Sequence, residues 1–320
     1  MACYTDFASF LSRHFSEKVQ KISINAGFTC PNRDGTKGVG GCTYCNNQTF
    51  SPGYCRPQKS VAEQLEEGKH FFAHKYPHMR YIAYFQAYTN TYGTLRQLES
   101  LYAEALAVDG VVGLIIGTRP DCVDDQLLDY LKGLARQRFV MVEYGAETSH
   151  NRTLALVNRG HTWEQTVDAV SRTAESGIPC GLHLILGLPG ESRQDILTTV
   201  ERASALPVDT LKMHQLQIVR GTKLARQVAD GEIDYNELTV DEYIDLCCEV
   251  VEHCREGVCI ERFVSQSPAE LLLSPRWGLK NYEFTNLLNR ELTRRGIRQG
   301  SKYREPETGN RESEITSNNQ

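Results

Sequence analysis

Apolar and amphipathic stretches alternate along the chain from about residue 21 to residue 255. Six apolar runs have the composition of strands, and they cover residues 21–27, 80–88, 111–118, 138–146, 180–187 and 211–219. Most of these runs are continuous rather than alternating, which is typical of parallel strands buried on both faces. The pattern therefore predicts an α/β protein with a largely parallel sheet.

Amphipathic stretches with helical periodicity separate the strands. They cover residues 61–76, 94–107, 123–137, 162–175 and 192–205. The expected N-caps are Thr94, Asp121, Thr162 and Ser192. Short polar side chains of this kind accept hydrogen bonds from the first N–H groups of a helix. Strand and helix alternate roughly every 30 to 40 residues, which indicates βαβ units. Six such units fit a partial barrel or a doubly wound sheet, and periodicity alone leaves both open.

One long segment interrupts this alternation. Residues 28–58, between the first two strands, contain no convincing helix or strand and are rich in Gly, Asn, Pro and Cys. A long irregular loop inside a compact domain is usually functional or disordered. This loop follows the carboxyl end of a strand, where barrels and open α/β sheets bind their ligands. The loop is therefore the first place to look for a site.

The C-terminal part continues with a helical pattern over 239–254, a short strand over 258–263 and a further helix over 281–295. Residues 287–304 carry six basic side chains against the single acid Glu291: Arg290, Arg294, Arg295, Arg298, Lys302 and Arg304. We favour a helix that docks on the barrel with a solvated charged face. The alternative is contact with RNA phosphates.

Composition excludes several classes of protein. The 320 residues hold 35 basic and 40 acidic side chains, a net charge of −5, so no overall basic field points to nucleic acid or membrane. No apolar run is long enough to span a membrane, and the first residues do not resemble an export signal. We therefore expect a cytoplasmic protein without a membrane partner. Its eleven cysteines should be reduced, and they suggest metal chemistry, redox chemistry or simple packing.

Three of the cysteines are concentrated in the irregular loop. Cys30, Cys42 and Cys45 form a C-x11-C-x2-C pattern, and the glycines between them allow the loop to fold back on itself. Three clustered thiolates suit an iron–sulfur cluster, or a zinc ion with a fourth ligand from Cys55 or a histidine. The spacing alone does not separate these two metals.

The loop also resembles the radical S-adenosylmethionine (radical SAM) superfamily. Tyr44 precedes the last of the three cysteines, and the cluster follows the first strand of a βα repeat. The lengthened first gap is similar to that of the elongator catalytic subunit and more similar still to YhcC-type proteins, over about residues 15–300. The resemblance implies a partial (β/α)6 TIM-like barrel with a small α-rich C-terminal extension. Its boundaries are then 1–20 for an N-terminal segment, 21–262 for the core, 263–302 for the extension and 303–320 for a disordered tail.

The resemblance further implies the cofactors and the reaction. Cys30, Cys42 and Cys45 hold a 4Fe–4S cluster, and S-adenosylmethionine (SAM) binds beside it. An electron donor such as flavodoxin or ferredoxin reduces the cluster, which cleaves SAM to a 5′-deoxyadenosyl radical. The radical then abstracts hydrogen from a substrate that the sequence does not name, with RNA or tRNA as one candidate.

The same resemblance assigns SAM contacts beyond Tyr44. Gln86 and Ala87 meet the SAM amino group through their backbone, where the family has two glycines. Either Glu143 or Glu147 contacts the ribose, and the planar donor fork of Arg159 suits the SAM carboxylate.

The turn that begins at Gly187 lies close to the adenosyl group. His183 on the strand before it is interpreted as a core residue rather than a ligand.

Other interpretations stay open at this point. A non-catalytic, zinc-stabilised RNA-binding protein would use the three cysteines together with Cys55. Four further cysteines favour packing over a second cluster: Cys247, Cys248, Cys254 and Cys259.

Overall fold

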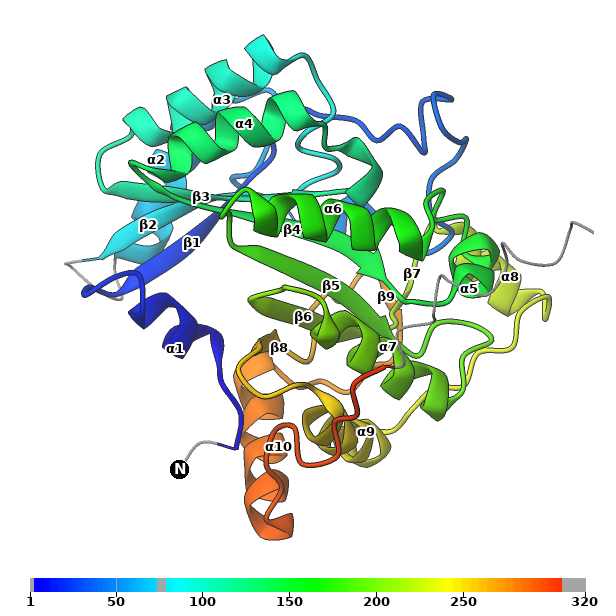
Figure 1. Ribbon diagram of the computed structural model, residues 1–320. Coiled ribbons are helices and arrows are strands. Elements are labelled where there is room, and N and C mark those ends of the chain that lie inside the picture. The colour runs from blue at the N-terminus through cyan, green and yellow to red at the C-terminus, as the bar shows by residue number, and fades with distance from the viewer. Residues whose placement is uncertain (1–2, 50, 74–78, 307–320) are drawn as a thin grey trace, which may run out of the picture.

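The computed structural model describes residues 3–49, 51–73 and 79–306, which form a curled parallel sheet covered by helices (Figure 1). The sheet consists of β1 (Val19–Ile24), β2 (Arg80–Phe85), β3 (Val111–Thr118), β4 (Phe139–Glu147), β5 (Cys180–Leu186), β6 (Thr210–Gln215) and β8 (Cys259–Arg262). All neighbouring strands are parallel, and their order in the sheet is their order in the chain. This sequential order confirms the partial barrel over the doubly wound alternative, whose strand order would reverse.

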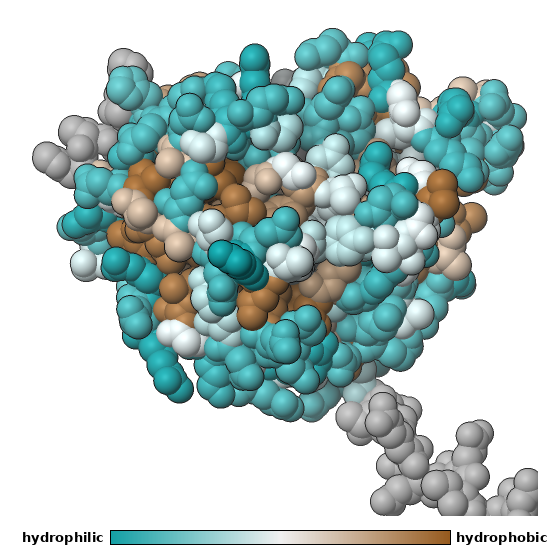
Figure 2. Space-filling model, turned by 90° about the horizontal axis from the view of Figure 1, so that it is seen from above, coloured by the Kyte–Doolittle hydropathy of each residue, from teal (hydrophilic) through white to brown (hydrophobic). Residues whose placement is uncertain are grey.

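Helices cover the outer face of the sheet. They include α2 (Val61–Ala73), α3 (Leu95–Ala107), α4 (Asp125–Ala135), α6 (Trp163–Glu175) and α7 (Arg193–Ala205). Outward-facing strand residues such as Ile22, Leu114 and Leu182 join one large core with these helices. Seen from above, hydrophilic residues surround smaller groups of apolar ones (Figure 2). The strands are therefore apolar because helices bury one face of the sheet and the side chains that fill the lumen bury the other.

The inner face of the sheet forms a layered lumen. At its amino-terminal end, Phe10 from α1 (Phe7–Ser12) packs against Ile82, Ile115 and Met141. Two residues further along β2 and β4, the inward side chains are Tyr84 and Glu143, which are hydrogen-bonded to each other. The lumen then opens into a cavity at the carboxyl ends of the strands. The short helix α1 therefore closes the barrel at the end opposite the cavity.

The remaining elements are short or belong to the C-terminal part. They are α5 (Asn151–Leu156), α8 (Lys223–Ala229), α9 (Val240–His253), α10 (Asn281–Arg295), the antiparallel pair β7 (Ile218–Val219) and β9 (Leu272–Ser274), and the 3-10 turns η1 (Asn47–Thr49) and η2 (Pro120–Cys122). Helix α10 buries Phe284, Leu288 and Leu292, and it contacts α9. This confirms the α-rich extension and its docking on the rest of the molecule.

Three details differ from the sequence prediction. The short strand expected over 258–263 is present as β8, but it joins the sheet as a seventh strand beyond the six expected units. The run 211–219 is not one strand, because β6 ends at Gln215 and the chain turns before β7. Asp124 caps α4, whereas the carboxylate of Asp121 accepts a hydrogen bond from Arg119 Nε. Thr94, Thr162 and Ser192 cap their helices as expected.

The two ends of the chain bear on the remaining predictions. Of the tail 303–320, residues 307–320 lie outside the described part of the chain. In the described ranges, no helix has both the length and the apolar composition that crossing a membrane requires.

Candidate active site

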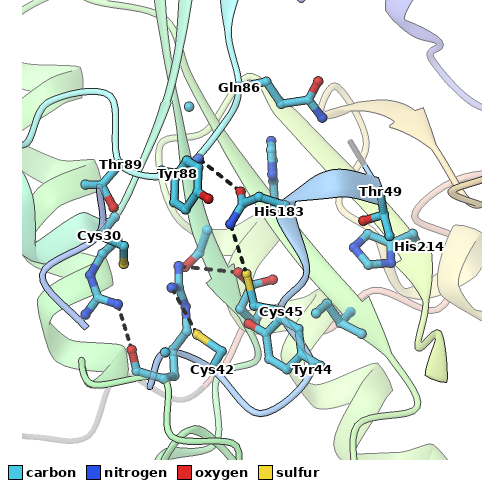
Figure 3. A pocket seen from close by; sticks show the side chains of 18 of the residues that line it. Cys30, Cys42, Tyr44, Cys45, Thr49, Gln86, Tyr88, Thr89, His183 and His214 are labelled. Carbon is cyan, nitrogen blue, oxygen red and sulfur yellow. Dashed lines mark hydrogen bonds and ion pairs between the residues drawn. The ribbon is translucent and has the colours of Figure 1, made fainter. Parts of the chain in front are cut away.

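The strand carboxyl ends and the cysteine loop enclose one cavity (Figure 3). Eight of the ten candidate residues line it: Cys30, Cys42, Tyr44, Cys45, Gln86, Glu143, Glu147 and Arg159. Ala87 is buried beside it, and Gly187 lies on a neighbouring hollow formed with residues 188–191. The loop between the first two strands therefore folds over residues contributed by β2, β4 and the segment after α5, as the partial barrel requires.

Asparagine side chains fasten the cysteine loop to the segment after α5. Asn32 Nδ2 donates to the carbonyl of Asn158 at 2.6 Å, and Asn158 Nδ2 donates to the carbonyl of Gly41 at 2.8 Å. Gly160 is required at this junction, because its φ is +74° and an added Cβ would lie 2.7 Å from Asn32 Oδ1. The loop is irregular in its backbone, but side-chain hydrogen bonds fix its position.

A buried ion pair fastens the same loop to β3. Asp121 contacts Arg119 Nε at 2.9 Å and Lys37 Nζ at 2.8 Å. Burial would raise the pKa of Asp121, but Arg119 and Lys37 outweigh this effect and hold it at about 2. Arg119 is only 2% exposed, lines the cavity and donates through Nη1 to the carbonyl of Arg159. The pair therefore connects the loop, β3 and the residue expected to bind SAM.

Polar groups from the loop surround the Cys45 thiol. Asn47 Nδ2 lies 3.4 Å from Cys45 Sγ, and Arg33 Nη2 donates to the Cys45 carbonyl at 3.0 Å. Burial and the neighbouring Cys42 raise the pKa of Cys45 to about 11. A metal that binds here must therefore displace the thiol proton.

The donor set fits an iron–sulfur cluster better than a single ion. Cys30, Cys42 and Cys45 line the same cavity, and thiolates are the preferred ligands of such clusters. Within the described ranges, no three Cys, His, Asp or Glu side chains converge as one metal ion requires. A four-iron cluster does not need this convergence, because each thiolate binds a different iron atom.

Arg159 lies between the cysteines and β4. It is 7% exposed, its Nη2 donates to the Gly145 carbonyl at 2.6 Å, and its Nη1 lies 3.7 Å from Cys42 Sγ. Glu147 pairs with the same guanidinium at 3.3 Å. Gly145 makes room for this arrangement, since an added Cβ would lie 2.5 Å from Arg159 Nη2. Arg159 is thus a buried cavity residue rather than a solvated charge at a helix end.

Glu143 belongs to a charged layer just below the cavity. Its Oε2 accepts from Tyr84 at 2.8 Å and from Lys212 at 3.2 Å, and it lies 2.6 Å from His183 Nε2. Glu261 joins the layer by accepting from Lys21 at 2.6 Å. This layer also corrects the interpretation of His183 as a plain core residue, because the imidazole lines the cavity.

Burial and neighbouring charges shift the pKa values of Glu143 and Lys212, the two central charges of the layer. Burial would raise the pKa of Glu143, but Lys212 and Lys21 hold it well below its usual range. Burial lowers the pKa of Lys212 to about 8. At neutral pH the layer is therefore a network of opposite charges held out of water.

The other cysteines are placed by packing. The Cys55 thiol is buried and donates to the Ser23 carbonyl at 2.8 Å, and it is absent from the cavity lining. Cys247, Cys248 and Cys254 lie in the main core, and Cys259 lies in the apolar cluster around Phe10. Packing thus accounts for these four as expected, and Cys55 does not join Cys30, Cys42 and Cys45.

Sequence reasoning missed several cavity residues. The prediction of a strand over 211–219 did not single out His214 or Gln217, and Arg119 and Arg262 were not predicted either. The signal for His214 was its position one strand period beyond Lys212. Arg262 carried no such signal, because an ordinary strand would turn Glu261 and Arg262 to opposite faces.

Comparison with known proteins gives two adjoining family matches. A model described as the radical SAM superfamily matches residues 27–203, and one described as the Radical_SAM C-terminal domain matches residues 208–294. The first match covers the cysteine loop and β2 to β5. The second covers β6, β8 and the helices α9 and α10.

Individual proteins match over different lengths. YhcC of Escherichia coli (strain K12) is 36% identical over 301 residues, which is 94% of this chain and 95% of YhcC. The tRNA uridine(34) acetyltransferase of Methanocaldococcus jannaschii is 26% identical over 190 residues, 58% of this chain and 34% of that protein. The solved structure of Methanocaldococcus infernus Elp3 superposes with a TM-score of 0.63 at 17% identity, covering 88% of this chain and 64% of the other. The last comparison supports the fold alone.

Proposed function

This chain belongs to the radical SAM superfamily and is a radical SAM enzyme, and from that premise we propose how its own residues perform the reaction. Three thiols and the buried guanidinium of Arg159 face a single cavity at the strand carboxyl ends, and this observation carries the proposal. A 4Fe–4S cluster and SAM are the cofactors that the family implies. When bound and reduced, they supply a 5′-deoxyadenosyl radical that abstracts hydrogen from the substrate.

In this proposal Cys30, Cys42 and Cys45 hold the cluster. The hydrogen bond of Asn32 and the ion pair of Lys37 hold the loop in place, so the three thiols face the cavity before a metal binds. Cys55 is not a ligand, since its thiol is directed to the Ser23 carbonyl.

Arg159 binds the SAM carboxylate, because its guanidinium lies against Cys42 and its Nε has no hydrogen-bond partner in the described chain. Glu143 contacts the ribose through Oε1, which also lacks a hydrogen-bond partner among the described residues. Glu147 is less suited to this role, because it already pairs with Arg159.

Tyr44, Gln86 and the backbone at Ala87 complete the SAM site. Gln86 holds its amide oxygen toward Ser23 Oγ at 3.0 Å, so its NH2 group is free to face the cavity. Gly187 has a φ of +91° and shapes the turn after β5, near which we place the adenosyl group. The electron donor is a small reductant such as flavodoxin or ferredoxin in the cytoplasm.

One anaerobic experiment tests the reaction. Reconstituted protein is incubated with dithionite and SAM, and 5′-deoxyadenosine is measured together with bound iron. We expect brown protein with about four irons and formation of 5′-deoxyadenosine. Colourless protein holding one zinc would contradict the proposal and support the zinc-stabilised RNA-binding alternative.

We further propose RNA, and tRNA in particular, as the substrate class. The similarity to a tRNA uridine(34) acetyltransferase supports this, as do three exposed arginines in the described C-terminal segment that form no ion pair: Arg290, Arg298 and Arg304. The other three basic residues of that segment are already paired with Glu291, Asp245 or Glu252.

The RNA proposal is tested by measuring the affinity for a tRNA transcript across a salt series. Replacing Arg290, Arg298 and Arg304 with Gln should flatten the salt dependence, because each phosphate contact adds about 0.9 to the slope for a duplex. Undetectable binding of the unchanged protein at low salt would remove RNA as the substrate class.

A further inference from the structure

Arg262 reaches the cavity through an irregularity in the last strand of the sheet. Leu211 of β6 pairs with Ile260 of β8, but the next residue, Lys212, pairs with Arg262, so the register skips Glu261. Glu261 accepts from Lys21 inside the lumen, and Arg262 lines the cavity above it. Two successive side chains thus point to the inner face of the sheet. A β-bulge allows this, whereas in a regular strand they would point to opposite faces.

The Arg262 guanidinium has no anionic partner. Neither a hydrogen bond nor an ion pair connects this side chain to any residue in the described ranges, and its Nε is buried without a partner. The two other arginines of the cavity wall that are buried differ in this respect. Arg119 pairs with Asp121 and Arg159 pairs with Glu147. A half-buried guanidinium without a counter-charge is costly to keep, so a ligand is the natural partner.

His214 and Gln217, which line the cavity together with Arg262, add neutral hydrogen-bonding groups. Burial and the nearby Arg262 lower the pKa of His214 to about 3, so its imidazole is neutral at pH 7. Gln217 lines the same wall and is held in place by donating to the Ser265 carbonyl at 3.0 Å. Figure 3 shows His214 across the cavity from Cys30. Arg262 is therefore the cationic group beside His214 and Gln217, and His214 lies across the cavity from Cys30.

We propose that Arg262 binds an anionic group of the substrate, a carboxylate or a phosphate, on the cavity wall opposite the cysteine loop. The inference rests on the proposed function, in which Arg159 beside Cys42 takes the SAM carboxylate and leaves Arg262 for the substrate. The planar guanidinium fork suits either anion, because both present two oxygens for a bidentate contact. The substrate is thereby held at β8 while its reacting carbon faces the adenosyl group.

The test follows the Arg262 Nε–Hε signal by ¹⁵N nuclear magnetic resonance on the reconstituted holoenzyme saturated with SAM. Acetate and inorganic phosphate are added separately as probes, and the spectrum of Arg262→Lys identifies the signal. We expect a saturable shift with at least one probe. The affinity of each variant is measured on the side-chain amide signals of Gln217, which lines the same cavity and is retained in all of them. Binding of that probe should weaken about tenfold or more in Arg262→Gln and partly recover in Arg262→Lys. Arg290→Gln is the control, because this exposed arginine lies outside the cavity and should leave the shift unchanged.

The two probes also separate the sources of the anion. A stronger response to phosphate indicates a nucleotide or RNA substrate, and a stronger response to acetate indicates a carboxylated one. The inference is overturned if neither probe shifts the signal, or if Arg262→Gln binds both as the unchanged protein does. Protein that responds to the probe but lacks a cluster and forms no 5′-deoxyadenosine contradicts the proposed function and leaves the anion site standing.

Discussion

Two adjacent levels of the same lumen differ in whether their charged side chains have a partner among the described residues. In the lower level, Lys21, Tyr84, Glu143, Lys212 and Glu261 contact one another at distances of 2.6 to 3.7 Å. In the upper level, three thiols and the Arg262 guanidinium face a cavity, and Arg262 has no counter-charge among the described residues. The two levels are adjacent, because Arg262 directly follows Glu261 and pairs in register with Lys212.

This difference separates structural charge from functional charge. Burying an ion is costly unless it is paired, and the lower level meets that condition with two lysines and two glutamates. The upper level leaves polar groups unsatisfied that a ligand could satisfy, which is what a binding site requires. Burial alone therefore does not identify a functional residue in this barrel. A buried donor or acceptor left without a hydrogen bond among the described residues, such as Arg262 Nε, Arg159 Nε or Glu143 Oε1, is the better indicator.

The largest expected effect is on the cysteines of the upper level. Replacing Cys30, Cys42 or Cys45 with Ala should abolish the 4Fe–4S absorbance after anaerobic reconstitution, because each change removes a cluster ligand. Iron content per protein checks the result.

Cys55→Ala is the matched control from the same loop, since its thiol bonds only to the Ser23 carbonyl and lies outside the cavity. It should keep a full complement of iron. A triple Cys→Ala variant that still binds a full cluster would contradict the assignment.

The next effect concerns the lower level. Lys212→Met should destabilise the fold by about 3–5 kcal/mol, because it leaves the buried carboxylates of Glu143 and Glu261 with only one of their two lysines, Lys21. Urea unfolding of the apo protein measures the loss. Lys59→Met removes a lysine from a surface pair with Glu67 and should change stability by about 0.2–1 kcal/mol. Equal losses in the two variants would show that the lower level is not structural.

The sequence predicts the fold and the cysteines of the upper level, but not the charged network of the lower level. Apolar strand runs and capping residues such as Thr162 depend on local chemistry, which a single sequence displays. The cysteine pattern was equally visible, because three thiols in one loop are rare. Asp121 was misjudged as a cap since its partners, Arg119 and Lys37, come from two separate segments.

The unpredicted part of the site depends on register. Glu261 and Arg262 both point into the lumen only because the register between β8 and β6 skips one position. His183 looked like a core residue because its environment is set by Glu143 and Lys212 on two other strands. Pairing between strands decides which charges are satisfied, and no pattern within one strand reports it.

A pH experiment tests the ion pairs of Asp121, which connect the cysteine loop to the barrel. The pKa of Asp121 is about 2 in the folded protein, below its ordinary value of 3.8. A depressed carboxyl pKa contributes stability that is complete above pH 3.8 and is lost as the pH falls through about 2; the shift corresponds to roughly 2 kcal/mol. Asp121→Asn should therefore be less stable than the unchanged protein at pH 6, and the difference should shrink below pH 4. Denaturant titrations at the two pH values measure it, and a constant difference would rule out the ion pair as the source.

The smallest effect sets Arg262 directly against Lys212. Both are basic residues of neighbouring strands, but only Lys212 has carboxylate partners. Removing an unpaired, half-buried guanidinium ends its desolvation cost, so Arg262→Met should keep the stability of the apo protein within about 0.5 kcal/mol or raise it slightly. Urea unfolding of both variants in one buffer gives the comparison. A loss with Arg262→Met as large as that with Lys212→Met would mean that Arg262 has a structural partner, and the distinction between the two levels of the lumen would fail. A neutral or stabilising result would mean that the fold tolerates this arginine rather than depends on it, which is expected of a residue retained for a ligand.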